Sequence, residues 1–283
     1  MALRKGKQET FLISIADATV IKDFYEFPNH PVSPDAFEET LGRFEKKFSQ
    51  WRCLLETEEL IRGDDRFNFS GYLAFQALRG QAFYDAAAKT ESDIVRTLIA
   101  SYSPEQMQLW LDKQENMCSL EESQLIQDRL LAGKIELELG SRAFVQHIDQ
   151  EIQAIRGLLA IRKWEYVLFK EAYLITSDEP IALLSAQEPR STDIYHAFMT
   201  ADQEILMPLT REIGLRIRPM SNEDLMDVAN GTHDIFRIGS AEEAQSFNHT
   251  VRRQAHSVIF AHPSDAALLH FDSDDASNLD CSN

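Results

Sequence analysis

The spacing of hydrophobic positions divides the chain into a helical first part and an extended second part. Apolar residues recur every three or four positions from Phe37 to Leu55, which predicts one long amphipathic helix reaching about residue 61. Ser33 is expected to cap this helix, and Pro34 suits its first position. Further helical patterns cover residues 67–88, 91–102, 104–116, 120–139 and 143–163.

From Trp164 onward the period becomes that of β-strands. Strand patterns cover residues 164–169, 172–176, 181–185, 205–210, 213–218 and 256–261, with short helices at 223–229 and 241–253 and earlier extended runs at 10–15 and 24–27. The predicted fold class is α+β, with a helical N-terminal half packed on a small, mostly antiparallel sheet from the C-terminal half.

This pattern predicts a single α+β domain over residues 1–263, with its helical part at about 35–163 and its sheet part at about 164–263. Residues 264–283 contain aspartates but neither Lys nor Arg, so we expect an acidic, disordered tail.

Composition narrows the classes of function. The 283 residues include 28 Lys and Arg against 46 Asp and Glu, a formal charge of −18 that argues against a nucleic-acid partner. Clustered arginines are expected to form a solvated face instead: Arg211, Arg216, Arg218, Arg252 and Arg253. No apolar run approaches the roughly 18 residues of a membrane helix, and the N-terminal apolar stretch is too short for an export signal. The predicted location is therefore the cytoplasm.

Metal and cofactor motifs are missing from the sequence. It contains no phosphate-binding glycine loop, no zinc-protease motif and no paired cysteines among Cys53, Cys118 and Cys281. His147 and Glu151 are one helical turn apart, but no third ligand follows in register, so ordinary surface histidines are favoured. We expect neither a metal nor a cofactor.

Two groups of polar residues stand out as candidate sites. Gln76 and Arg79 share one face of the helix predicted at 67–88, where a guanidinium needs a carboxylate or an anionic ligand unless it only links two elements. The run Leu174-Ile-Thr-Ser-Asp-Glu-Pro-Ile181 takes a hydrophobic strand directly into Thr176, Ser177 and Asp178. These residues either brace a turn or form a site at the rim of the sheet.

Asn248 is a weaker candidate. It lies on the predicted helix 241–253 just before the last strand, where a structural amide is the alternative to a ligand contact.

The chain resembles the bacterial and phage domain-of-unknown-function family numbered 4238 over about residues 8–263. The resemblance rests on Asp23-Phe-Tyr-Glu-Phe27, Phe37-Glu-Glu-x-Leu-x-x-Phe-Glu45, Phe75-Gln-x-x-Arg79, Trp164, Leu174-Ile-Thr-Ser-Asp-Glu-Pro180, Met207-Pro-Leu209, Asn248 and Ala255. It implies a cytoplasmic bacterial or phage protein and no particular reaction. The N-terminal His-Tyr-Val-Pro segment usual in that family is not found here, so the chain starts late, has been trimmed or has lost that part. If the histidine of that segment takes part in chemistry, this copy is expected to be inactive.

Two functions remain open. In a hydrolase-type enzyme, Arg79 and Gln76 would orient an anionic or carbonyl-bearing substrate in a polar pocket between the helical layer and the sheet. Asp178 would act as a general base or orient another group, Ser177 or Thr176 would be the nucleophile or a donor, and Asn248 would polarise the substrate. The alternative is a non-catalytic binding or interaction module of a mobile-element or defence system, in which Arg79 and Asp178 form a structural ion pair. The oligomeric state is not predicted.

Overall fold

The computed structural model describes residues 1–7, 9–13, 36–113, 116–135, 137, 140–184, 203–219, 225–229 and 231–270. The chain divides into two compact units. The main unit consists of Met1–Phe83 with Ile148–Asn283, and the helical unit consists of Tyr84–His147.

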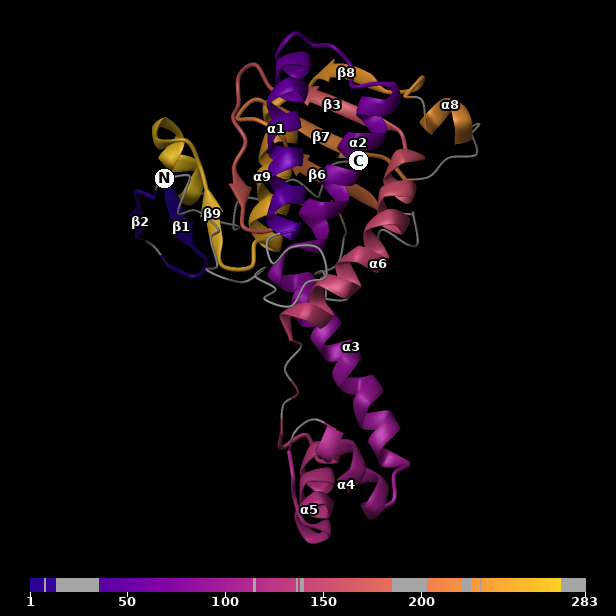
Figure 1. Cartoon of the computed structure of the whole chain (residues 1–283). Helices are drawn as coiled ribbons and strands as arrows, with labels where there is room; N and C mark the ends of the chain where they lie inside the picture. Colours follow the sequence, from indigo (N-terminus) through magenta and orange to yellow (C-terminus); the bar gives the residue numbers. More distant parts are fainter. Residues whose placement is uncertain are drawn as a thin grey trace, which may run out of the picture. The chain divides into compact units, whose positions relative to one another are not determined.

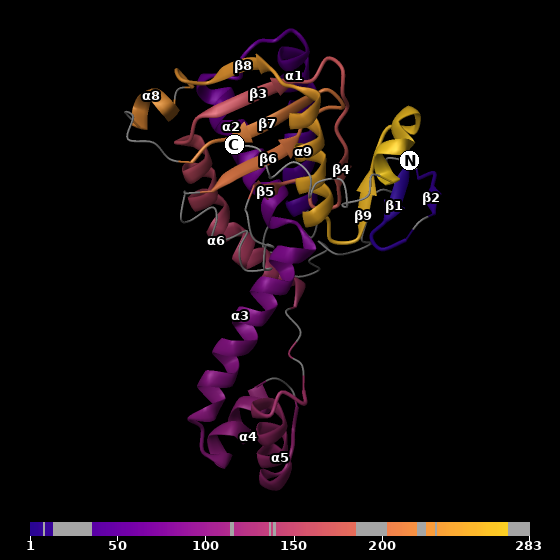
Figure 2. The same cartoon turned by 180° about the vertical axis from the view of Figure 1, so that it is seen from behind.

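A five-stranded sheet forms the centre of the main unit, in the order β5-β6-β7-β3-β8. Its strands are β3 (Trp164–Leu168), β5 (Ala182–Leu184), β6 (Glu204–Pro208), β7 (Ile213–Ile217) and β8 (Ile235–Ile238). β3 pairs with β7 antiparallel and with β8 parallel. Helices α1 (Ala36–Glu56) and α2 (Gly63–Leu78) lie on one side of the sheet in Figure 1, and α9 (Ala241–Gln254) lies on the other side in Figure 2.

Aromatic side chains join α1 and α2 to the sheet. Trp51 of α1 meets Phe69 of α2 at a ring-centroid distance of 4.9 Å, and Phe69 meets Trp164 of β3 at 5.8 Å. All three are fully buried, and the Trp164 indole N–H also donates to the Leu159 carbonyl of α6 (Ser141–Ala160). The alternation of β3 thus places Trp164 towards the helices, as its buried pattern requires.

α9 covers the opposite face of the sheet with its own hydrophobic core. Phe247 and Val251 of α9 are buried with Val167 and Phe169 from the region of β3. Gly214 of β7 lies directly under Phe247, because a Cβ at this glycine would be 2.7 Å from the Phe247 ring. This close approach lets α9 lie flat on the sheet.

A four-stranded sheet extends the main unit in the order β2-β1-β9-β4. Its strands are β1 (Ala2–Arg4), β2 (Thr10–Phe11), β4 (Thr176–Ser177) and β9 (Val258–Phe260), followed by the 3₁₀ helix η1 (Pro263–His270). The Lys5 ammonium donates to the Arg253 and Ala255 carbonyls at the end of α9, at 3.0 and 2.7 Å. A cation at a helix C-terminus satisfies carbonyls that have no partner within the helix.

The helical unit contains most of α3 (Gln81–Ala100), α4 (Pro104–Lys113) and α5 (Leu120–Leu131). Its buried core includes Ile99, Met107, Leu111 and Leu130. Ser119 and Glu122 form a complete capping box at the start of α5, as the sequence Ser-x-x-Glu predicts.

The predicted α+β class is confirmed, since helices dominate the N-terminal half and mostly antiparallel strands the C-terminal half. The predicted helix over 67–88 is wrong in one respect, because the chain breaks at Arg79 and Gly80 and restarts as α3. Of the predicted strand over 172–176, only Thr176 is in a strand, in β4. The strands β1 and β8 were not predicted.

The prediction of a disordered tail is wrong for residues 264–270. Residues 264–270 belong to η1, where Leu269 is fully buried and Asp265 lies 2.6 Å from the Arg211 guanidinium. Hydrogen bonds from Arg211 outweigh partial burial and lower the pKa of the Asp265 carboxyl. The cap at Ser33 and Pro34, the strand at 24–27 and the rest of the tail lie outside the described residues.

Candidate functional site

Asp178 directly follows β4 and is bound to the start of β9. Its carboxylate accepts backbone N–H bonds from His256, Ser257 and Val258 at 3.0, 2.7 and 3.1 Å, and a fourth bond from the Ser257 hydroxyl at 2.7 Å. In the described residues every hydrogen bond of this carboxylate goes to the start of β9, so Asp178 does not form the ion pair with Arg79 that the interaction-module alternative includes. A carboxylate is well suited to this place because one side chain can accept several bonds at once.

Ser177 braces the turn that follows β4. Its buried hydroxyl donates to the Glu179 carbonyl at 2.7 Å and accepts from the Glu179 N–H at 3.2 Å. Thr176 precedes it in β4 and pairs with Phe260 of β9. The hydroxyl proton of Ser177 is therefore directed at a backbone carbonyl, which is the turn-bracing alternative expected for this run.

Asn248 acts as a clamp from α9 onto the extended segment before β4. Its side-chain carbonyl accepts from the Ile175 N–H at 2.9 Å, and its amide donates to the Tyr173 carbonyl at 2.8 Å. The amide thus satisfies a donor and an acceptor of one strand-like segment, as a neighbouring strand would.

Glu179 was not predicted as important, yet it connects the two groups of candidate residues. Its buried carboxylate accepts from the Ala82 N–H at 2.9 Å, at the start of α3. It also lies against Gly80, where any Cβ would overlap the carboxylate. Gln76 is buried in the last turn of α2, and Arg79 is the C-cap residue of that helix. The sequence signal for this contact between Glu179 and the chain after α2 was the glycine at position 80.

The run from Leu174 to Ile181 is therefore a brace, in which successive polar residues hold different parts of the main unit. The segment before it is held by α9, Asp178 holds β9, and Glu179 holds the junction of α2 and α3. We call this run the brace motif.

A buried ion pair joins α2 to the chain just before β8. Arg66 of α2 and Asp234 before β8 are both completely buried, with Arg66 Nε 2.6 Å from the carboxylate. The guanidinium also donates to the carbonyls of Ala160, Arg162 and Ala229 and lies 4.0 Å from the Trp164 ring. Asp234 in turn accepts from the Trp164 N–H. Since these bonds satisfy both charges, the pair is structural.

Six charged residues, one of them from α9, form a closed ring on the same face of the sheet as α9. Arginines and glutamates alternate, each touching two of the opposite charge: Glu165, Arg218, Glu204, Arg216, Glu243 and Arg237. The distances from Glu165 to Arg218 and Arg237 are 2.8 and 3.2 Å. We call this the charge ring; sequence reasoning missed it because its members come from four strands and α9.

The charge ring keeps its groups ionised. Burial would raise the pKa of Glu165, but hydrogen bonds and charges from Arg218 and Arg237 outweigh burial and lower the pKa. Hydrogen bonds from Arg237 likewise lower the pKa of Glu243, and the same bonds raise the pKa of Arg237. These shifts move the groups away from neutrality, whereas a general acid or base needs a pKa near the working pH.

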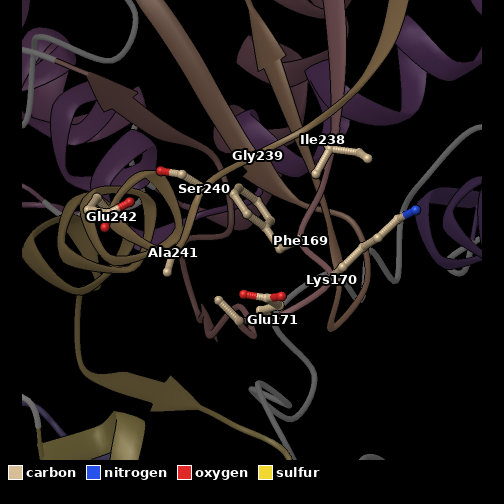
Figure 3. A pocket seen from close by; sticks show the side chains of 9 residues that line it. Phe169, Lys170, Glu171, Ile238, Gly239, Ser240, Ala241 and Glu242 are labelled. Carbon is tan, nitrogen blue, oxygen red and sulfur yellow. The ribbon is translucent and has the colours of Figure 1, made fainter.

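A pocket of about 440 Å³ lies elsewhere, at the ends of β3 and β8 and the start of α9 (Figure 3). Phe169, Gly239 and Ser240 line it, together with the exposed Glu171 and Glu242. None of the predicted site residues lines this pocket. Acidic residues in the first turn of α9 already complement the positive end of the helix dipole.

Within the described ranges, no group of three or more His, Cys, Asp or Glu side chains is arranged to hold a metal ion. Among the helices of the same ranges, none has the length and apolar character that a membrane crossing requires.

The fold and the brace motif define an α+β protein in which the most distinctive sequence run connects distant segments of backbone. The chain belongs to the family described as protein of unknown function (DUF4238), whose model matches residues 2–265. No curated protein and no solved structure matches it.

Proposed function

We propose that the chain is a non-catalytic interaction module that binds a protein partner through its helical unit. The observation that carries this proposal is the distribution of exposed apolar side chains. Of the thirteen large hydrophobic residues exposed in the described ranges, seven belong to the helical unit: Ile94, Leu98, Leu109, Met117, Leu120, Leu125 and Leu131. Such concentrations of exposed apolar residues mark interaction sites in soluble proteins.

The contacts of the brace motif support the choice of binding over hydrolysis. A hydrolase-type reaction at this motif would need Ser177 or Thr176 beside a free base and Asn248 aimed at substrate. The Ser177 proton is instead directed at the Glu179 carbonyl, and Asp178 and Asn248 bind backbone groups. Hydrolysis is therefore not part of the proposal, and no anionic or carbonyl-bearing ligand is assigned to Gln76 and Arg79.

Charge indicates the kind of partner. Residues 84–147 contain eleven acidic and six basic residues, a formal charge of −5. On α5, the exposed Glu121, Leu125 and Asp128 follow at i, i+4 and i+7 and so share one face, with Leu120 and Leu131 beside it. An acidic face with leucines is complementary to a basic amphipathic helix.

The setting of the proposed module follows from the sequence and the family. We place it in the cytoplasm of a bacterial or phage-infected cell, in a mobile-element or defence system. Nucleic acid is not among the proposed partners, because Arg211, Arg216 and Arg218 are all paired with carboxylates. No cofactor is included.

The test uses a fluorescent, helical Leu/Lys peptide as the probe and anisotropy as the readout. We expect the double variant Leu125→Ser/Leu131→Ser to bind the peptide about tenfold more weakly than the unaltered chain, since each substitution removes exposed apolar area. Leu12→Ser, at an exposed site in the main unit, is the matched control and should bind normally. Equal binding by the double variant, or by a scrambled peptide that forms no amphipathic face, would contradict the proposal.

A further inference from the structure

β8 is an edge strand of the five-stranded sheet and has unused hydrogen-bonding groups. The Gly239 N–H donates to Leu168 of β3 at 2.9 Å, so the backbone of Ile235 and Arg237 also turns towards β3. Phe236 and Ile238 then turn their N–H and C=O groups to the open side. In the described ranges, no hydrogen bond joins these outward-facing groups to another segment.

At two other places near the sheet edges, backbone groups without a strand partner are hydrogen-bonded by side chains of α9. At the opposite edge of the same sheet, the Leu183 N–H of β5 donates to the side chain of Gln254. Asn248 closes the segment beside β4 in the same manner. Proteins close or charge edge strands because an open edge is a template for pairing with another chain.

The exposed side chains of β8 include two isoleucines, whereas a protected edge strand would carry charged residues or proline. Ile235 is 39% exposed and Ile238 is 62% exposed, on opposite faces of the strand. Neither Pro nor Lys occurs in the strand, and its Arg237 side chain is held in the charge ring. The edge is thus open in its backbone and apolar in its side chains.

We propose that β8 pairs antiparallel with β8 of a second copy of this chain, which makes one continuous sheet across a two-fold axis. Antiparallel pairing is self-complementary when Phe236 lies opposite Phe236 of the second copy. Both residues then exchange their outward N–H and C=O groups, and Ile235 of each copy faces Arg237 of the other. Sliding one strand by two residues would place the two Arg237 side chains opposite each other, so repulsion between like charges selects the first register.

Sedimentation velocity of the full chain, from low-micromolar to submillimolar protein, tests this pairing. We expect a concentration-dependent dimer that Ile238→Lys weakens at least about tenfold, because an edge lysine must be buried on pairing. The exposure of Ile238 means that this substitution leaves the fold intact. Leu12→Lys, which also puts a lysine in place of an exposed apolar residue but lies outside β8, should dimerise like the unaltered chain.

Three outcomes would overturn the inference. They are a monomer at every concentration, a dimer that Ile238→Lys does not weaken, and a dimer that Leu12→Lys weakens as much as Ile238→Lys does. The last of these would mean that the added charge, and not the edge of β8, controls self-association. Because the peptide-binding test uses Leu125 and Leu131, failure of the edge pairing leaves the proposed function untouched.

Discussion

Single residues in the brace motif act through the backbone of distant segments. Glu179 binds the Ala82 N–H across 97 residues of sequence, and Asp178 binds the Ser257 N–H across 79. Such contacts restrict the neighbouring residues as well, since Gly80 has room for hydrogen only. The energetic importance of the motif can therefore be tested at the glycine rather than at the carboxylate.

Gly80→Ala is expected to destabilise the protein by about 1–3 kcal/mol, because the new methyl group must displace a buried, hydrogen-bonded carboxylate. Gly157→Ala on α6 is the matched control, since nothing lies within 4 Å of its added Cβ. There, higher helix propensity should stabilise by about 0.5–1 kcal/mol. Urea unfolding measures both values.

A double variant separates overlap from other effects of the alanine. If Gly80→Ala acts by displacing Glu179, its cost in the presence of Glu179→Ala should fall well below its cost alone. Strictly additive costs, or a Gly80→Ala variant as stable as Gly157→Ala, would refute the close approach.

At the scale of elements, the charge ring connects four strands to α9 without a hydrophobic cover. The fold lowers the pKa values of Glu165 and Glu243. The stability they contribute is therefore present above the ordinary carboxyl pKa of about 4.3 and is lost as pH falls through the lowered folded values.

Glu165→Gln tests this pH dependence. We expect stability to decline less steeply with falling pH below about pH 5 in this variant, by up to about one proton in the linkage slope. The measurement is the free energy of urea unfolding across a pH series. Glu121→Gln, at an exposed position of α5, should keep the slope of the unaltered chain. Identical slopes for Glu165→Gln and the unaltered chain would show that the charge ring does not titrate with folding.

Element boundaries show where sequence patterns were sufficient and where they were not. The helical stripe ending at Leu55 and the switch to strands at Trp164 depend on local periodicity, and both appear in the structure. The helix break at Gly80 was missed because the apolar period continues through it, while the cause lies at Glu179. β8 was missed because it is four residues long and pairs in parallel with β3.

At the scale of the whole molecule, the class α+β could be predicted, but the roles of the candidate residues could not. The sequence brought attention to Ser177, Asp178 and Asn248 because polar groups beside a strand resemble a catalytic site. Their partners are backbone groups of distant segments, which carry no signature in a sequence. The prediction of a single domain over 1–263 is kept as a proposal, which would require both compact units to unfold together.

If the brace motif holds the main unit together, Asp178→Ala must weaken the fold. The substitution leaves three backbone donors of residues 256–258 without their carboxylate. We predict a loss of about 1–2 kcal/mol in the free energy of unfolding, because several hydrogen bonds to a charged group are lost together while most of the freed donors can bind water. Asp149→Ala, at an exposed site on α6, should change it by less than about 0.5 kcal/mol. If Asp178→Ala is as stable as Asp149→Ala, the contacts of Asp178 do not hold the main unit together.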